Sequence, residues 1–200
     1  SREDLLAIRE LMRGSKTKLI AKIENEEGIE HIDQIIEEAD GIMIARGDLG
    51  VEIPVERVPI LQKKIIYKCR LRGKPVIVAT QMLESMKDSL IPTRAEVSDI
   101  ANAVMDGTDA VMLSAETSVG KYPAESVAMM NKIAKEAESI LQPQKMFGHT
   151  KASDETDEIC REISELTDKL KLKGVIVLSK TGNTVSSLSR HRLNTPIWAL

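Results

Sequence analysis

Apolar and polar residues alternate along the first 142 positions in a pattern that predicts strands and helices in turn. Short apolar runs are typical of buried strands, and stretches with apolar residues three and four positions apart are typical of amphipathic helices. The predicted strands are Leu19–Glu24, Ile42–Ala45, Val76–Ala79 and Ala110–Leu113. This alternation predicts βα units that build a parallel sheet.

Each predicted strand ends in, or is soon followed by, a polar or charged residue: Glu24, Asp48, Thr80 and Ser114. These positions lie 24 to 34 residues apart, which suits successive βα units. A complete eight-stranded barrel needs about 250 residues, so four units correspond to half of one. We therefore expect residues 1–142 to form half of a TIM-type (β/α)8 barrel.

Two stretches make specific local predictions. Residues 28–39 carry apolar side chains at helical spacing and are predicted to form one helix. The segment Thr93-Arg94-Ala95-Glu96 has the form of a capping box, which predicts that a helix begins there.

The apolar rhythm stops after residue 142, and the polar stretch 143–153 is predicted to be a linker. Beyond it, the pattern predicts a helix, a strand, a polar turn, another helix and a last strand. We expect residues 154–200 to begin a second α/β domain. Its predicted strands are Gly174–Leu178 and Pro196–Leu200.

Composition narrows the class of protein. The 200 residues are 42% hydrophobic and 30% charged, which is typical of a globular protein. A net charge of −3 and an aromatic content of 2% argue against nucleic-acid binding, and no apolar run is long enough for a membrane span. Cys69 and Cys160 are expected to be reduced core thiols of a cytoplasmic protein. Because the first residue is Ser, we expect a fragment or a processed chain.

The stretch from Gly41 to Pro54 carries the first candidate chemistry. Its apolar half ends at Ala45 and is followed by Arg46-Gly47-Asp48-Leu49-Gly50. Glycines allow close approach of the backbone to an anion, and an aspartate adds a hard oxygen ligand. A plain surface turn rich in Asp and Gly is the alternative interpretation.

Parallel strands bring their carboxyl ends to one mouth, so we expect Glu24 and Asp48 to lie side by side. Lys22 shares the face of Glu24 because side chains alternate along a strand. Two close carboxylates suit Mg²⁺ or Mn²⁺, and the lysine could stabilise a phosphoryl group or an enolate oxygen. The alternative is a solvated surface ion pair. Thr80 and Ser114 could contact substrate or could cap turns.

Five motifs resemble the pyruvate kinase family. They are Ala21-Lys22-Ile23-Glu24-Asn25, the stretch Ile42–Gly50, Ala79-Thr80-Gln81-Met82-Leu83, Pro92-Thr93-Arg94-Ala95-Glu96 and Met112-Leu113-Ser114-Ala115-Glu116-Thr117. They occur in the family's order, and the resemblance runs from about Arg2 to Leu200. It implies the C-terminal half of the catalytic barrel followed by the beginning of the α/β C-terminal domain. Ala115 stands where the family usually has Gly.

The resemblance implies transfer of the phosphoryl group of phosphoenolpyruvate to ADP, giving pyruvate and ATP. It assigns Glu24 and Asp48 to a Mg²⁺ or Mn²⁺ ion and Lys22 to the moving phosphoryl group. It further implies K⁺ in the complete enzyme at a site outside this chain, a homotetramer and a place in glycolysis in the cytoplasm.

The resemblance also assigns residues to the rest of the substrate. The backbone N–H groups of Gly47 and Asp48 resemble the seat of the substrate carboxylate, at the start of a short helix. Thr80 resembles the residue near the carbon that gains a proton, with Ser114 behind it.

In the second domain, one turn resembles the loop that grips a sugar-phosphate or nucleotide activator in many members of the family. Hydroxyls, a lysine and a glycine suit a phosphate group, although an ordinary strand-to-helix turn has the same composition. The residues of this turn are Ser179, Lys180, Thr181, Gly182, Asn183 and Thr184.

Two other functions compete with a kinase. One is a metal-dependent aldol lyase that acts on pyruvate enolate, which could do without the charge of Lys22. The other is a non-catalytic binding or assembly module, because four strands do not close a barrel. For that reason we expect the 200-residue chain to be inactive alone.

Overall fold

The computed structural model describes residues 1–140 and 155–200. The chain divides into two compact units, Ser1–Ile140 and Leu141–Leu200. The predicted linker 143–153 lies outside the described residues. Each unit is described by itself below.

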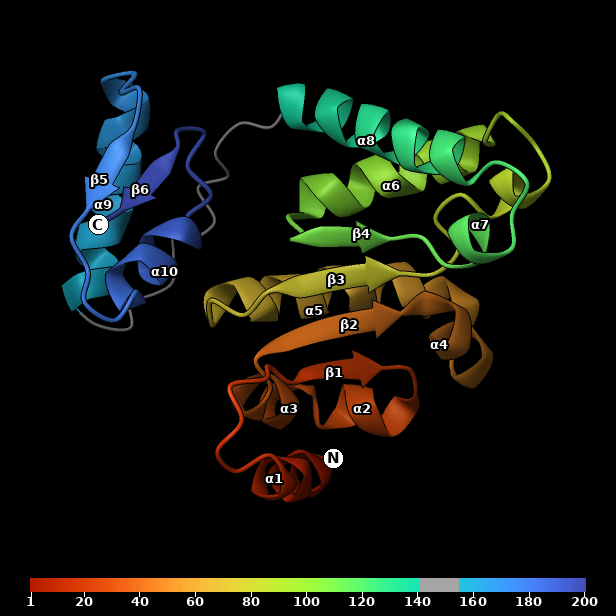
Figure 1. Ribbon diagram of the computed structural model, residues 1–200, viewed down its shortest axis with the longest axis horizontal. Helices are drawn as coiled ribbons and strands as arrows, with labels where there is room; N and C mark the ends of the chain where they lie inside the picture. The colour runs from red at the N-terminus through yellow and green to blue at the C-terminus, as the bar shows by residue number, and fades with distance from the viewer. Residues whose placement is uncertain (141–154) are drawn as a thin grey trace. The chain divides into compact units, whose positions relative to one another are not determined.

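The first unit is built on a four-stranded parallel sheet in the order β1-β2-β3-β4 (Figure 1). Each strand coincides with a predicted one, so the parallel βα arrangement is confirmed. The register pairs Ile23 with Ile44 and Ala45 with Ala79, which aligns the carboxyl ends. The strands are β1 (Ile20–Ile23), β2 (Gly41–Ala45), β3 (Val76–Ala79) and β4 (Ala110–Met112).

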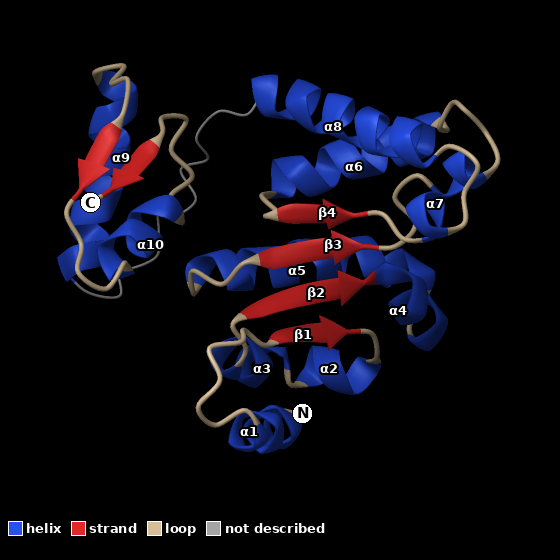
Figure 2. Cartoon of the chain, viewed as in Figure 1, coloured by secondary structure: helices blue, strands red, loops and turns tan. Residues whose placement is uncertain are grey.

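Helix α1 precedes β1, and further helices follow each of the four strands. In the view of Figure 2, α3 and α5 lie behind the sheet, and α5 contacts β2 and β3. Helix α6 contacts β4 and packs on α8. The helices are α1 (Arg2–Leu11), α2 (Glu26–Glu30), α3 (Ile32–Glu38), α4 (Arg46–Glu52), α5 (Val58–Leu71), α6 (Arg94–Asp106), α7 (Ala115–Ser118) and α8 (Pro123–Ile140), with 3₁₀ turns η1 (Val55–Arg57) and η2 (Glu84–Lys87).

The single helix predicted for residues 28–39 is wrong. Two helices, α2 and α3, replace it, because the backbone of His31 leaves the helical region with φ −96° and ψ 14°. Helix α2 begins early because the side chain of Asn25 accepts a hydrogen bond from the N–H of Gly28 at 2.9 Å. Apolar spacing continues across the break, so the pattern could not reveal it.

The two faces of the sheet differ in burial. The side chains of Ile42, Ile44, Val76 and Val78 are fully buried beneath the helices. The opposite face carries a row of paired residues, Lys22, Met43, Ile77 and Ala110, which are exposed or only partly buried. Within residues 1–140, no helix lies over this face in the view of Figure 2.

The second unit contains a parallel pair of strands with two helices. Helix α9 (Glu155–Lys169) precedes β5 (Val175–Val177), and α10 (Asn183–Ser189) precedes β6 (Ile197–Ala199). Its small core includes Cys160, Val177 and Leu188. No helix among the described residues of either unit is long and apolar enough to cross a membrane.

The capping box predicted at the start of α6 is present and extends to a neighbouring loop. Glu96 accepts hydrogen bonds from the backbone N–H groups of Thr93 and Ser85, both at 2.7 Å, and from the Ser85 hydroxyl at 2.6 Å. Burial acts to raise the pKa of Glu96, but the hydrogen bonds from Ser85 and Thr93 outweigh it and hold that pKa below its ordinary value.

Replacing Glu96 by glutamine should therefore make stability less dependent on pH. A carboxyl whose pKa is lower in the folded state stabilises the fold above its unfolded pKa, and this contribution is lost as pH falls through the folded pKa. Urea unfolding at pH 7 should show that Glu96→Gln is less stable than the parent, and the difference should vanish in acid. The same change at exposed Glu138 is the control. A difference of equal size at both pH values would contradict the assignment.

Candidate active site

The carboxyl ends of β1 to β4 all lie at one edge of the sheet. In Figure 1 the four arrowheads point to the same side, where α4 and α7 also lie. Glu24 directly follows β1, Thr80 directly follows β3, and Asp48 and Ser114 follow β2 and β4 within three residues. The parallel sheet thus gathers the predicted residues at one edge, as the sequence indicated.

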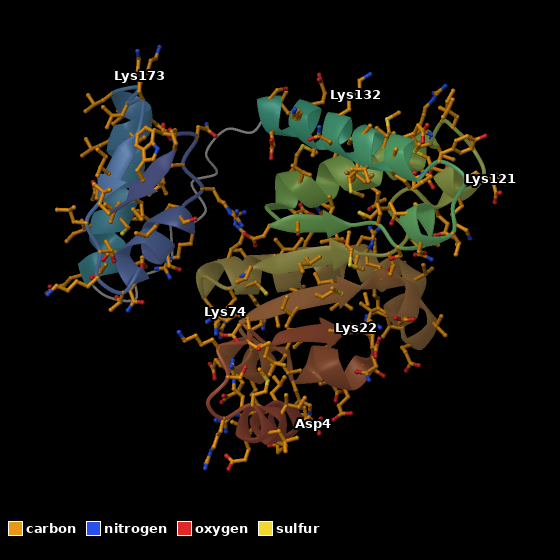
Figure 3. All side chains as sticks on the ribbon, viewed as in Figure 1. Asp4, Lys22, Lys74, Lys121, Lys132 and Lys173 are labelled. Carbon is orange, nitrogen blue, oxygen red and sulfur yellow. The ribbon has the colours of Figure 1, made fainter. Side chains whose placement is uncertain are left out.

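Lys22, Glu24 and Asp48 form a charged cluster at this edge. Lys22 Nζ donates a hydrogen bond to Asp48 Oδ2 at 3.0 Å and also contacts Glu24 Oε2. Figure 3 labels Lys22 on β1. The hydrogen bonds with Glu24 and Asp48 raise the pKa of Lys22, and the contact with Lys22 lowers the pKa of Asp48. All three side chains are about half exposed, so solvent can reach them.

The donor set fits a hard divalent cation. Two carboxylates from neighbouring strand ends already converge on one positive charge, the ammonium of Lys22. Magnesium is commonly held by one or two protein carboxylates, with water and substrate oxygens completing its coordination. Among residues 1–140 and 155–200, no group of three or more His, Cys, Asp or Glu side chains is placed to hold a metal ion.

Thr80 lies in a strained turn that follows β3. Its φ is 67° and that of Gln81 is 53°, a region that β-branched side chains rarely adopt. The Thr80 hydroxyl accepts a hydrogen bond from the N–H of Gly47 at 2.7 Å and donates one to the carbonyl of Ala79 at 2.6 Å. An anion that binds the Gly47 N–H would replace the first of these contacts.

Arg46 has a role that the sequence analysis missed. Its buried guanidinium donates to the carbonyl of Thr80 through Nη2 at 2.7 Å and to that of Gln81 at 3.0 Å. Its Nη1 donates to Asp99 Oδ2 on α6 at 2.5 Å. The sequence showed only a basic residue at the end of an apolar strand, and no local pattern indicated which groups it would bind by hydrogen bonds.

The sequence analysis named Glu116 only within a motif and gave it no role of its own. Its carboxylate is fully buried and accepts from the N–H groups of Leu83 at 3.0 Å and Ser114 at 2.8 Å. It therefore ties the segment after β3 to the segment after β4. Ser114 precedes α7 and is partly buried, and Ala115 is the first residue of that helix.

The turn predicted to bind an activator lies in the second unit. Ser179 Oγ accepts a hydrogen bond from the N–H of Gly182 at 3.0 Å, and Gly182 has φ 82° just before α10. Residues 180–184 are exposed. The turn therefore has the strand-to-helix form expected of it, with accessible hydroxyl, amide and ammonium groups.

A parallel sheet with polar and charged side chains gathered at the carboxyl ends of its strands is the arrangement found in (β/α)8-barrel proteins. Comparison with known proteins narrows this class. A family model described as pyruvate kinase, barrel domain, matches residues 1–127. The chain belongs to the pyruvate kinase family.

Individual relatives agree with the family model. A pyruvate kinase from Clostridium acetobutylicum is 48% identical over 204 residues, which covers 99% of this chain and 43% of that protein. One from Leishmania mexicana is 50% identical over 192 residues, covering 92% of this chain and 38% of that protein. The crystal structure of a pyruvate kinase from Cryptosporidium parvum matches with a TM-score of 0.91 at 39% identity, covering 100% of this chain and 43% of that one. The chain thus spans less than half the length of these relatives.

Proposed function

We propose that this chain carries the phosphoryl-transfer edge of a pyruvate kinase, which moves the phosphoryl group of phosphoenolpyruvate to ADP. The observation that carries the proposal is the placement of Lys22 between Glu24 and Asp48 at the carboxyl edge of the sheet. A movable positive charge beside a cation site suits a migrating phosphoryl group. An aldol lyase could do without that lysine, and the similarity to pyruvate kinases favours an enzyme over a non-catalytic module.

Glu24 and Asp48 would hold Mg²⁺ or Mn²⁺ through their carboxylate oxygens. The bound ion would neutralise charge on the oxygens of the substrate. Lys22 would orient the phosphoryl group and stabilise the charge that develops on it during transfer. The exposure of all three side chains supports this assignment, because the groups remain accessible to substrate.

Thr80, Gly47 and Ser114 would complete the substrate site. The N–H groups of Gly47 and Asp48 would bind the substrate carboxylate. The Gly47 N–H now donates to the Thr80 hydroxyl, and the carboxylate would take the place of that hydroxyl. Thr80, with Ser114 on the neighbouring strand end, would position or deliver the proton that the enolate carbon gains. Both hydroxyls lie at the edge that carries the charged cluster.

The proposal includes further properties of the complete enzyme. These are a K⁺ site in a part of the protein outside this chain, a homotetramer, a cytoplasmic place in glycolysis and an activator with a phosphate group at residues 179–184. The exposed hydroxyls and glycine of that turn support phosphate binding there.

The test is a coupled assay on a full-length protein that contains this chain, with phosphoenolpyruvate, ADP, Mg²⁺ and K⁺. We expect pyruvate and ATP to form in equal amounts. Cleavage of a longer oxo acid to pyruvate without ATP would favour the lyase instead, and no turnover of either substrate would contradict both enzymes.

Removing either carboxylate should weaken metal binding. Glu24→Gln and Asp48→Asn each take one charged oxygen ligand from the cation, so Mn²⁺ affinity should fall by about tenfold or more. Water-proton relaxation by Mn²⁺ measures this without any turnover. Glu30→Gln, which changes an exposed carboxylate on α2, is the matched control. Parent-like affinity in both variants would show that the metal lies elsewhere.

A further inference from the structure

The turn after β3 holds two consecutive residues in a backbone conformation that favours glycine. Thr80 and Gln81 have φ values of 67° and 53°, and neither is glycine. Such a conformation persists only where the surroundings over-determine it, and it concentrates at functional sites. One of the two strained residues is Thr80, whose hydroxyl the proposed function places at the substrate.

The turn is held mainly through the carbonyls of the strained residues. Arg46 Nε and Nη2 both donate to the Thr80 carbonyl, at 3.2 and 2.7 Å, and Nη2 also donates to the Gln81 carbonyl at 3.0 Å. A guanidinium is planar with a fixed fork of donors, so it fixes the direction of both carbonyls at once.

Arg46 is itself anchored on the opposite side. Nη1 donates to Asp99 Oδ2 on α6 at 2.5 Å and lies 3.5 Å from Gln62 Oε1 on α5. The guanidinium is buried, whereas the side chain of Asp99 is 40% exposed. The strained turn is therefore braced against two helices through one side chain.

We propose that Arg46 is a positioning residue, which keeps the Thr80 hydroxyl at the substrate by clamping the carbonyls of Thr80 and Gln81 in their left-handed conformation. This inference rests on the proposed function, because it assumes that Thr80 acts on the substrate. Arg46 acts through Thr80, because it donates to the backbone carbonyls that fix the turn.

The test uses the full-length protein, two variants at Arg46 and one control variant. Arg46→Met should lower kcat about tenfold to a hundredfold with a smaller change in KM, because small misplacements of a catalytic group carry costs of that size. Arg46→Lys keeps the charge beside Asp99 but cannot bridge two carbonyls, so kcat should also fall. It carries the test if Arg46→Met does not fold. Arg57→Met, at an exposed arginine of η1, is the control and should behave as the parent.

Replacing Gln81 by glycine distinguishes an Arg46 that holds the strained turn in place from an Arg46 that only stabilises the fold. The side chain of Gln81 is exposed, and glycine adopts positive φ without strain. In the Arg46→Lys background, Gln81→Gly should recover kcat several-fold, whereas Gln81→Ala, which loses the same side chain but keeps the strain, should not. Equal recovery by glycine and alanine, or none by either, would overturn the clamp.

The parent protein is measured first, which keeps the two proposals apart. A parent that forms no pyruvate overturns the proposed function. An active parent whose kcat survives both changes at Arg46 overturns the clamp alone.

Discussion

Replacing Lys22 by methionine should lower turnover of the full-length protein by about a hundredfold or more, with a smaller change in the Michaelis constant. Removal of one preorganised stabilising group from a transition state commonly costs a factor of that size. Lys22 Nζ contacts Asp48 Oδ2 and Glu24 Oε2. From this position its positive charge can stabilise the negative charge that develops during phosphoryl transfer. Methionine keeps the length of the side chain but removes the charge.

Steady-state kinetics with phosphoenolpyruvate and ADP as varied substrates give kcat and KM separately. Lys18→Met changes another exposed lysine, on the loop before β1, and serves as the control. A change confined to the Michaelis constant would make Lys22 a binding residue rather than a stabiliser of the transition state. Mn²⁺ relaxation on the same variant shows whether the site still binds a metal.

The fold was predictable because its signal is local and periodic. Short runs such as Val76–Ala79 are apolar, are bounded by glycine, proline or polar residues, and recur at intervals of a βα unit. The break at His31 was not predictable, because the residues on both sides keep the apolar spacing of one helix. At Gly47 and Gly50 the alternative of a plain surface turn is wrong: α4 runs through both, in keeping with the short helix that the resemblance implied, and the side chain of Leu49 in it is buried.

The cluster at the strand ends was predictable for a similar reason. Alternation along β1 places Lys22 and Glu24 on one face, and a parallel sheet brings Asp48 beside them. Arg46 and Glu116 are different. Several of their partners are backbone groups that lie 33 to 35 residues away, at Thr80, Gln81 and Leu83. A backbone carbonyl or N–H leaves no mark on the sequence. Contacts of that kind become visible only once the strands are in register.

A polypeptide of these 200 residues alone should show no measurable turnover of phosphoenolpyruvate. Strands β1 and β4 are the two outer strands of the four-stranded sheet, and among the described residues each pairs with only one other strand. The row from Lys22 to Ala110 is not buried beneath a helix of this unit. Open edges and a partly apolar face favour association with other chains.

The cluster of Lys22, Glu24 and Asp48 should not be sufficient for turnover by itself. Phosphoryl transfer depends on positioning and charge neutralisation around the whole phosphoryl group, and this chain supplies one arc of four strands where the fold has eight. A coupled pyruvate assay with Mg²⁺, K⁺ and ADP measures turnover, and size-exclusion chromatography measures association. Appreciable turnover by a preparation that lacks longer chains would contradict the half-barrel interpretation. Recovery of turnover on mixing with the amino-terminal half of a related pyruvate kinase would show that Lys22, Glu24 and Asp48 were poised and lacked only the remaining strands.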